Sequence, residues 1–349
     1  MISRLFESLL LCPEDVKPSR DDCKVIGVFN PGAIKVRDEV VLLVRVAENP
    51  IQERPGFVGL PYWENGSRVV QWVAEDELDV ADPRVVRWKH DRLLRLTSIS
   101  HLQVFRKRDG DSAWVPGPMI LPDSPLEEFG IEDPRITQID QTYWITYVAV
   151  SRHGVATALA STTDMVTFKR HGLIFCPENK DVVLFPQRIA GHYVALHRPN
   201  PNSHFSPPQI WLARSTDFMH WGQHQILYSG HANWESDRVG GGTPPVLLDE
   251  GWLHLYHGSQ RSERQDQVGA YSVGALLLDR DDPSIILARS SQPIMVPTAD
   301  FEQNGFVPGV VFPPAMMVQG ETLSVYYGAA DTSVGVVGFS RAKMLAALS

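Results

Sequence analysis

The segment GIEDPRIT (residues 130–137) runs into QTYWITY (residues 141–147), and together they decide the predicted fold. The second segment alternates aromatic or β-branched residues with polar ones, which is the period-2 pattern of a half-buried strand. The acidic pair Glu132 and Asp133 therefore lies at the mouth of a predicted β-hairpin. Pro134 fixes its own φ and favours an extended Asp133, so we expect a rigidly held carboxylate. Taken alone, the stretch fits equally well a structural turn with an ion pair between Asp133 and Arg135.

A proline-marked turn followed by an aromatic-rich strand recurs along the chain. The copies begin at Asn30-Pro31, Asp82-Pro83-Arg84, Asp133-Pro134-Arg135, Phe185-Pro186, Pro244-Pro245 and Phe312-Pro313. Six hairpins at intervals of roughly 50 to 70 residues are typical of a radial β-repeat, and a propeller around a central pocket is its natural closed form. The sequence therefore predicts an all-β protein with one short terminal helix over Arg341–Leu348.

Composition limits the classes of partner. The chain has 349 residues and a net charge of −9, which argues against a nucleic-acid or anionic-membrane surface because both need a basic footprint. Any anion must then be held by a local cluster of cations. No linker or low-complexity segment divides the chain, so we predict one catalytic domain over residues 1–349. Whether it forms a homo-oligomer stays open.

The cysteines and the N-terminus indicate a cytoplasmic protein. Cys12, Cys23 and Cys176 are odd in number and lack the spacing of a metal site, so they read as free thiols of a reducing compartment. The apolar run near Leu9–Leu11 is too short for export or for a membrane span. We expect neither a disulfide framework nor a bound metal.

The motifs exclude several kinds of chemistry. Phosphate-loop, dinucleotide, nucleophile-elbow and zinc patterns are missing from the sequence, and Gly240-Gly241-Gly242-Thr243 fits close backbone packing at a pocket better. A glycoside-cleaving carboxylate pair remains, with Asp133 as the acid. The partner carboxylate is left open among Glu132, Glu235, Asp237 and Asp331. Arg45 interrupts the apolar run Val40–Val46, so it is either a structural ion-pair member or a ligand contact.

Six motifs, in order, resemble glycoside hydrolase family 130, which comprises β-mannoside phosphorylases and a smaller set of β-1,2-mannosidases. The motifs are FNPGA (29–33), EDPRI (132–136), NKDVVLFP (179–186), LHRP (196–199), GWLHLYHG (251–258) and YYGAADT (326–332). The resemblance implies a five-bladed β-propeller, one blade fewer than the six hairpins. The six hairpins are compatible with five blades if the two ends of the chain share one blade.

The resemblance also implies roles for individual residues. Asp133 matches the proton donor, while Asn30, Arg45 and Asp331 match residues that hold the donor sugar. Further candidates are taken from position in the chain. They are Arg152 and Arg170 as the chief phosphate ligands, Lys180, Arg198, Arg214 and His257 as weaker ones, and His257 also as a substrate contact.

The expected activity is that of an inverting β-mannoside phosphorylase. It would convert a β-mannosyl di- or oligosaccharide and phosphate into α-mannose 1-phosphate and a shortened sugar, with no cofactor beyond the phosphate. The first alternative is a β-1,2-mannosidase, in which water replaces phosphate and a second carboxylate acts as base. The second is a sugar-binding propeller without catalysis. The phosphorylase reading requires Arg152 and Arg170 to reach the pocket.

Overall fold

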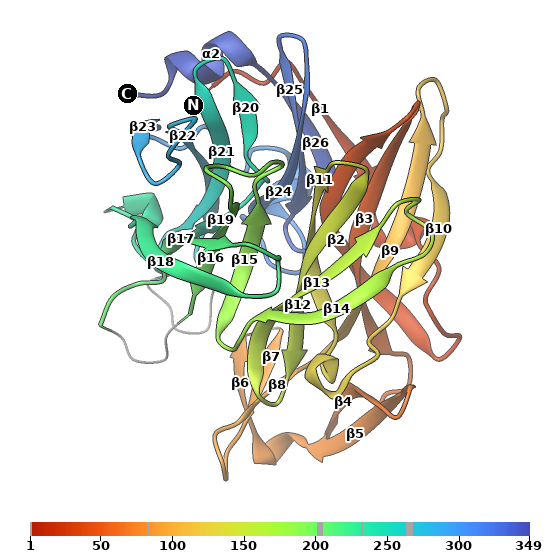
Figure 1. Ribbon diagram of the computed structural model, residues 1–349. Helices are drawn as coiled ribbons and strands as arrows, with labels where there is room; N and C mark the ends of the chain where they lie inside the picture. The colour runs from red at the N-terminus through yellow and green to blue at the C-terminus, as the bar shows by residue number, and fades with distance from the viewer. Residues whose placement is uncertain (1, 83, 201–204, 232, 263–267) are drawn as a thin grey trace.

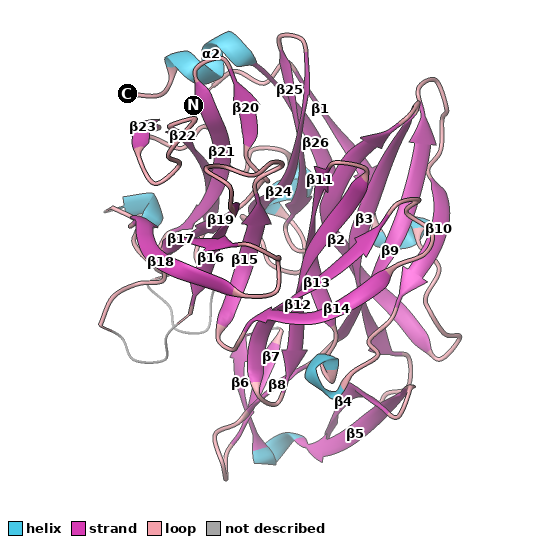
Figure 2. Cartoon of the chain, viewed as in Figure 1, coloured by secondary structure: helices cyan, strands magenta, loops and turns pink. Residues whose placement is uncertain are grey.

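Five antiparallel sheets build most of the molecule in a computed structural model that describes residues 2–82, 84–200, 205–231, 233–262 and 268–349 (Figure 1). Strands dominate, as the repeat pattern predicts, and the two helices α1 (Asp300–Gln303) and α2 (Arg341–Ala346) are short (Figure 2). The terminal helix was predicted from the sequence. Four single-turn 3-10 helices also occur, η1 (Pro13–Asp15), η2 (Glu75–Glu77), η3 (Pro125–Glu127) and η4 (Asn233–Glu235).

Each large sheet is formed mainly by consecutive strands. The first sheet holds β2 (Cys23–Val36), β3 (Glu39–Pro50), β9 (Ile99–Arg108) and β10 (Val115–Ile120). The second holds β11 (Ile131–Ile139), β12 (Thr142–Ser151), β13 (Gly154–Thr162) and β14 (Lys169–Phe175). The third holds β15 (Asn179–Leu184), β16 (Tyr193–Pro199), β17 (Ile210–Ser215) and β18 (Trp221–Tyr228). The fourth holds β19 (Arg238–Gly241), β20 (Val246–Leu248), β21 (Gly251–Ser259), β22 (Tyr271–Leu278) and β23 (Ile286–Arg289).

The two ends of the chain share the fifth sheet. It holds β24 (Val311–Gln319), β25 (Thr322–Ala329), β26 (Ser333–Ser340) and β1 (Phe6–Leu11). β1 runs antiparallel to β26, with Phe6 opposite Gly338, and the two termini lie near each other (Figure 1). This pairing confirms the sequence-based expectation that the ends meet in one sheet.

The first strands of the sheets contact one another around the molecule. β2 contacts both β24 and β11, β11 contacts β15, and β15 contacts β19. The fourth sheet contacts the fifth, because β21 and β22 contact β24. Residues from all five sheets can therefore reach one central region.

An insertion between β3 and β9 forms two small sheets. They are β4 (Phe57–Glu64) with β5 (Ser67–Ala74), and β6 (Leu78–Asp82) with β7 (Val85–Trp88) and β8 (Leu94–Leu96). Leu60, Val73 and Val86 belong to its own hydrophobic cluster. The Asp82-Pro83-Arg84 copy falls in this insertion, although Pro83 lies outside the described residues. The structure therefore has five large sheets where the sequence predicted six hairpins, because the Asp82-Pro83-Arg84 copy belongs to a small sheet of the insertion.

The same irregularity interrupts the first strand of four large sheets. In each case two residues face one on the partner strand, which defines a β-bulge. The pairs are Asn30-Pro31 in β2, Asp133-Pro134 in β11, Asp181-Val182 in β15 and Pro313-Pro314 in β24. Asp133 has a φ of 48°, so the prediction of an extended Asp133 was wrong. A residue that precedes a proline prefers extended backbone angles, but here the bulge imposes a left-handed conformation on Asp133.

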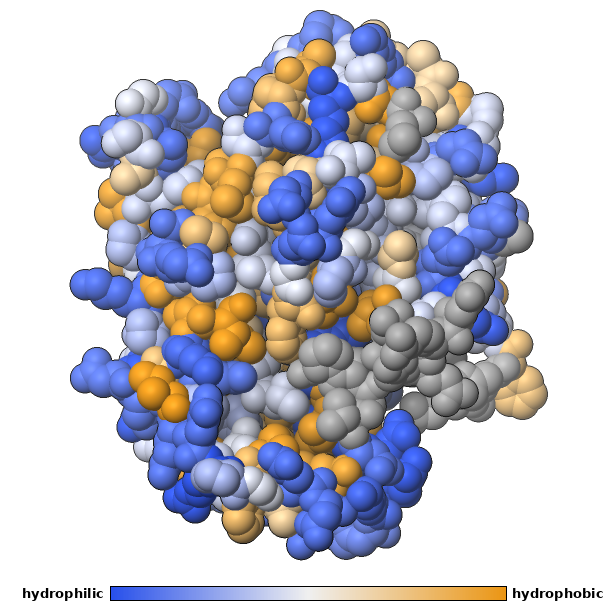
Figure 3. All heavy atoms as spheres, turned by 180° about the vertical axis from the view of Figure 1, so that it is seen from behind, coloured by the Kyte–Doolittle hydropathy of each residue, from blue (hydrophilic) through white to orange (hydrophobic). Residues whose placement is uncertain are grey.

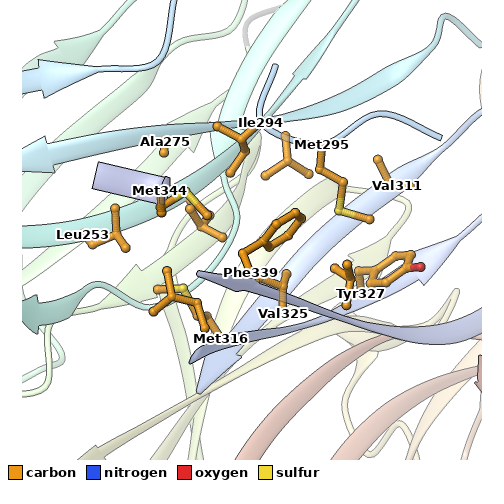
Figure 4. Close-up of a cluster of buried hydrophobic side chains, with 14 of the residues drawn as sticks. Leu253, Ala275, Ile294, Met295, Val311, Met316, Val325, Tyr327, Phe339 and Met344 are labelled. Atoms are coloured by element: carbon orange, nitrogen blue, oxygen red, sulfur yellow. The ribbon is translucent and has the colours of Figure 1, made fainter. Parts of the chain in front are cut away.

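The largest buried cluster joins the fourth and fifth sheets. Leu253 and Ala275 pack there against Phe339 and Met316, and Met344 of α2 closes the cluster (Figure 4). Hydrophobic residues on the face shown in Figure 3 form separate patches between charged ones. None of the helices in the described part of the chain has the length and apolar character needed to cross a bilayer.

Candidate active site

A cavity of about 250 Å³ lies where the first strands of the large sheets meet. Its polar lining comes from all five large sheets and from the insertion. The residues are Asn30, Arg45, Arg84, Glu132, Asp133, Lys180, Asp181, Arg198, Arg238, His257, Tyr271 and Asp331. Three bulged residues, Asn30, Asp133 and Asp181, are among them, so the bulges turn these side chains into the cavity. The geometry brings together five of the residues named from the sequence as catalytic or sugar-binding: Asp133, Asn30, Arg45, Asp331 and His257.

Asp133 is buried and held from two sides. Asn30 Nδ2 donates a hydrogen bond of 2.8 Å to Asp133 Oδ1, and Arg45 Nη1 lies 3.2 Å from the same oxygen. Burial alone would raise the pKa of Asp133, but the charges of Arg45 and Lys180 outweigh it and hold that pKa below its ordinary value. Asp133 is therefore a carboxylate at neutral pH when the cavity holds no ligand.

Arg45 resolves the alternative that the sequence left open. Its Nη2 pairs with Glu132 Oε1 at 2.8 Å, and its Nε donates to Ser100 Oγ at 3.0 Å. The side chain also lines the cavity. Arg45 is thus an ion-pair member and a potential ligand contact at the same time, and its pairing compensates for a cation within a buried strand.

Asp331 reaches the cavity from the turn after β25. Its pKa is raised chiefly by burial, which Arg84 and Arg45 offset only in part. Arg84 Nη1 lies 3.6 Å from Asp331 Oδ2. The end of β25, just before this turn, passes close to Asn30, because a Cβ on Gly328 would stand 1.9 Å from Asn30 Oδ1. Glycine at that position is therefore required by packing at the site.

A cationic group of side chains occupies another part of the cavity wall. Arg198 Nη1 contacts Asp181 Oδ2 at 2.7 Å and donates to His257 Nε2 at 3.0 Å. His257 is neutral, because burial lowers its pKa to about 3. Its accepting Nε2 places the proton on Nδ1. Arg198 Nε and His257 Nδ1 are buried donors without a partner among the described residues, and such groups call for a ligand or a water.

Lys180 extends this cationic group towards Asp133. Within the described ranges, its ammonium makes no hydrogen bond or ion pair, although it acts electrostatically on Asp133, Asp181 and Asp331. Arg238 lines the same cavity, with its Nε 2.6 Å from Asp237 Oδ2. Lys180, Arg198 and Arg238 therefore offer donors to an anion beside the carboxylates.

The structure does not bring Arg152, Arg170 and Arg214 into this cavity. Arg152 pairs with Glu128 through two nitrogens, at 2.9 and 2.5 Å, and lines a neighbouring cavity. Arg170 pairs with Glu127 at 2.7 Å, and Arg214 with Asp282 at 3.2 Å. The expected pair of converging arginines is thus not formed, since each guanidinium already has its own carboxylate. Of the predicted phosphate ligands, the weaker candidates Lys180, Arg198 and His257 line the cavity.

The candidates for a second catalytic carboxylate are also separated. Glu235 lies buried between two phenols, accepting from Tyr228 and Tyr256 at 3.0 and 2.5 Å, and it does not line the cavity. Asp237 does not line it either. Glu132 and Asp331 do, but each has an arginine partner. No group of His, Cys, Asp or Glu in the described part of the chain is arranged to hold a metal ion.

Four polar residues of the lining were not identified from the sequence as site residues: Asp181, Arg84, Arg238 and Tyr271. Asp181 could have been found, because Lys180-Asp181 belongs to a quoted motif and occupies the position equivalent to Asp133 in its own sheet. Arg84 stands in the quoted Asp82-Pro83-Arg84 turn. For Arg238 and Tyr271 the sequence carries no comparable signal. Gly240 confirms the predicted close packing, since a Cβ there would lie 2.5 Å from His257 Cε1.

Comparison with known proteins identifies the family. The glycoside hydrolase family 130 model, described as β-1,4-mannooligosaccharide phosphorylase, matches residues 106–349. A β-1,2-mannobiose phosphorylase of Listeria innocua serovar 6a is 41% identical over 341 residues, which cover 95% of this chain and 94% of that protein. A 1,2-β-oligomannan phosphorylase of a Thermoanaerobacter species is 37% identical over 63% of this chain and 71% of its own length.

A solved structure agrees with these relatives. The β-1,2-mannobiose complex of the Listeria innocua phosphorylase superposes with a TM-score of 0.91 at 40% identity, and it covers 97% of this chain and 96% of the other. The family match covers more than half of the chain, and the identity extends over nearly all of it. This chain therefore belongs to glycoside hydrolase family 130.

Proposed function

We propose that this protein is an inverting β-mannoside phosphorylase that acts on β-1,2-linked mannobiose and related oligosaccharides. Phosphate attacks the anomeric carbon of the terminal mannose, and the products are α-mannose 1-phosphate and the shortened sugar. The observation that carries the proposal is the group Lys180, Arg198 and Arg238, which lines the same cavity as Asp133. The phosphorylases of Listeria innocua and Thermoanaerobacter support the reaction and the linkage.

Phosphate is assigned to the cationic part of the cavity. Lys180 supplies an ammonium without a partner in the described ranges, and Arg198 and Arg238 supply guanidinium groups. The unpaired donors Arg198 Nε and His257 Nδ1 gain acceptors when an anion arrives. A phosphate dianion needs to be bound and aimed rather than deprotonated by a carboxylate base, so this arrangement suits phosphorolysis better than hydrolysis.

The donor mannose is assigned to Asn30, Arg45 and Asp331. The amide nitrogen of Asn30 donates its hydrogen bond to Asp133, while Asn30 Oδ1 is a buried acceptor without a partner among the described residues. A sugar hydroxyl can donate to that oxygen. Asp331 offers a second acceptor, and Arg84 holds its carboxylate from the insertion side. The sugar is thus positioned between the acid and the phosphate.

Asp133 is assigned as the acid, and the proton balance closes without an outside source. Monohydrogen phosphate and the mannoside together contain one transferable proton, which ends on the leaving sugar when the C–O bond breaks and the phosphate ester forms. Asp133 is ionised in the free enzyme because Arg45 and Lys180 lower its pKa. A phosphate on Lys180 neutralises part of that field, so its arrival favours protonation of Asp133.

The five large sheets are assigned as the blades of a five-bladed propeller, and residues 1–349 as a single catalytic domain. Contacts between successive first strands, and from the fourth sheet to β24, support closure. Pairing of β1 with β26 supports a blade made from both chain ends, which is a common way to hold a propeller closed.

Synthesis in the reverse direction tests the function. The purified protein is incubated with α-mannose 1-phosphate and mannose, and phosphate release and disaccharide formation are followed. We expect both to rise together in equal amounts. Release of phosphate with free mannose alone would contradict the proposal and would point to a hydrolase.

A further inference from the structure

Two adjoining cavities lie outside the active-site cavity, between the insertion and the second large sheet. They measure about 380 Å³ and 280 Å³, and the larger falls in the size range of small-molecule sites. They share Tyr62, Glu64, Glu128 and Arg152 in their walls, and we name them together the insertion groove. Leu96 lines both the groove and the active-site cavity, so the two are neighbours.

The walls of the groove are held in place before any ligand binds. Glu64 pairs with Ser67, and the two residues between them, Asn65 and Gly66, have φ values of 49° and 76°. This is the geometry of a tight type I′ turn, which fixes the β4–β5 hairpin. The hairpin is tied to the opposite wall because the Trp63 backbone N–H donates to Glu128 O at 2.7 Å. The groove is therefore preorganised.

The charge of the groove excludes an anion as its ligand. The three carboxylates Glu64, Asp123 and Glu128 line it and outnumber the two arginines, Arg95 and Arg152. The guanidinium of Arg152 is already neutralised by Glu128, although 62% of its side chain is exposed. Carboxylates in excess repel phosphate, but they accept hydrogen bonds from neutral hydroxyl groups. Arg152 Nη1, for which no bond occurs within the described residues, can donate to such a hydroxyl.

Two aromatic side chains complete this chemistry. Tyr62 and Trp63 are half-buried, and Trp63 lines the larger cavity beside Arg152. A pyranose has apolar C–H faces, which pack on aromatic rings, and a rim of hydroxyl groups, which bond to carboxylates and guanidinium groups. Aromatic rings flanked by three carboxylates and two arginines match a neutral sugar.

We propose that the insertion groove is a distal subsite for mannosyl residues that lie beyond the cleaved bond of an oligosaccharide. The proposal rests on the proposed function. The active-site cavity of about 250 Å³ holds the sugars at the bond that is broken, and a longer chain leaves it past Leu96 into the groove. The insertion thereby sets a preference for chain length.

Chain-length kinetics test this subsite. We compare kcat/KM for β-1,2-linked manno-oligosaccharides of two to five units in the wild type, Trp63→Ala and Arg152→Ala. The matched control is Trp72→Ala, since Trp72 belongs to the same hairpin but lines other surface cavities. We expect both groove variants to lose about tenfold on the pentasaccharide relative to the disaccharide, as for loss of one central aromatic or arginine contact. The control keeps the wild-type length dependence, and all three keep the wild-type KM for phosphate.

Binding gives a readout that does not depend on turnover. Calorimetric affinity for the pentasaccharide is measured in the Asp133→Asn background, with and without Trp63→Ala. A tenfold weaker Kd in the double variant supports the subsite. Equal losses for all chain lengths, or a wild-type kcat/KM that is the same for two and five units, overturn it and leave the proposed function standing. Absence of any phosphate-dependent cleavage of the disaccharide would instead overturn the proposed function.

Discussion

Asn30 Nδ2 donates a 2.8 Å hydrogen bond to Asp133 Oδ1, although 103 positions separate the two residues in the chain. Each belongs to a bulge in the first strand of its own sheet, and each has a positive φ, 51° for Asn30 and 48° for Asp133. The contact exists because neighbouring sheets carry the same irregularity at the same level. Backbone strain of this kind concentrates at functional sites, where the surrounding structure holds it in place.

Asp133→Asn should remove the acid while keeping the shape of the side chain. General acid catalysis typically contributes about 10² to 10⁴ in rate, so we expect kcat to fall at least a hundredfold. The midpoint of thermal unfolding should change by only a few degrees, because Arg45 keeps its pair with Glu132. Steady-state kinetics and calorimetry check both statements. Wild-type turnover in this variant would remove Asp133 from the mechanism.

Lys180→Ala should weaken the use of phosphate specifically. A hydrogen bond to a charged group contributes about 1.5 to 3 kcal/mol, so the KM for phosphate should rise about ten- to a hundredfold, with a smaller change in the KM for the mannoside. The measurement is initial rate against phosphate concentration at saturating mannoside. A raised KM for the mannoside with an unchanged KM for phosphate would contradict the assignment of Lys180.

Arg170→Ala is the matched comparison, because Arg170 was an expected phosphate ligand that pairs with buried Glu127 instead. Removing one member of a buried pair leaves the other uncompensated, at a cost of about 3 to 5 kcal/mol in the free energy of unfolding. We expect lower stability in denaturant titration and an unchanged KM for phosphate. A large rise in that KM, with stability preserved, would restore Arg170 to the phosphate site.

Gly328→Ala should disturb the site through packing alone. The added Cβ would meet Asn30 Oδ1 at 1.9 Å and Asn30 N at 2.8 Å, so Asn30 must move away from Asp133. Overpacking of this kind costs about 1 to 3 kcal/mol in stability, and kcat/KM should fall at least tenfold as the donor-sugar contacts are displaced. Gly222→Ala serves as control, since its Cβ would meet nothing within 4 Å. Equal activities in the two variants would show that Asn30 need not stay in place.

Stability should fall as the solution is acidified below about pH 6.5. Burial lowers the pKa of His197, His254 and His257 to about 3, 4 and 3, from an ordinary value of 6.5. Between about pH 4 and 6.5 the unfolded chain therefore binds up to three protons that the folded protein does not. Each contributes about 1.4 kcal/mol per pH unit to the loss. Unfolding free energies measured across this window check the slope, and His254→Leu should reduce the number of protons taken up on unfolding by about one.

The repeat pattern predicted much of the fold because proline and aromatic residues mark local turns and strands. It misassigned Asp82-Pro83-Arg84, which occupies the insertion, because a tripeptide specifies a turn but not the sheet that the turn joins. The repeat pattern likewise made Phe185-Pro186 the counterpart of Asp133-Pro134. In the structure, the residues of the third sheet that correspond to Asp133-Pro134 are Asp181-Val182. Sequence alone gives no register across sheets, and register decides which residues meet.

The sequence named residues of the cavity lining where a motif points to a side chain directly, as for Asn30, Asp133 and Asp331. In the cationic wall, Lys180 and Arg198 were named only as weaker candidates and Arg238 was not named, because whether an arginine faces a cavity depends on which carboxylate lies next to it. Arg152 directly follows strand β12, and Arg198 lies within strand β16. Glu128 nevertheless holds Arg152 at the surface. Asp181 and His257 hold Arg198 inside the protein. Such choices arise from tertiary packing and leave no mark in the local pattern.

Product analysis with β-1,2-mannobiose, in the presence and absence of phosphate, separates phosphorolysis from hydrolysis. Phosphorus NMR follows mannose 1-phosphate and its anomeric configuration, and chromatography follows mannose. We expect cleavage that depends on phosphate and saturates with it, yielding one α-mannose 1-phosphate and one mannose for each disaccharide. Two mannose molecules for each disaccharide at the same rate without phosphate, and no mannose 1-phosphate when phosphate is restored, would contradict phosphorolysis.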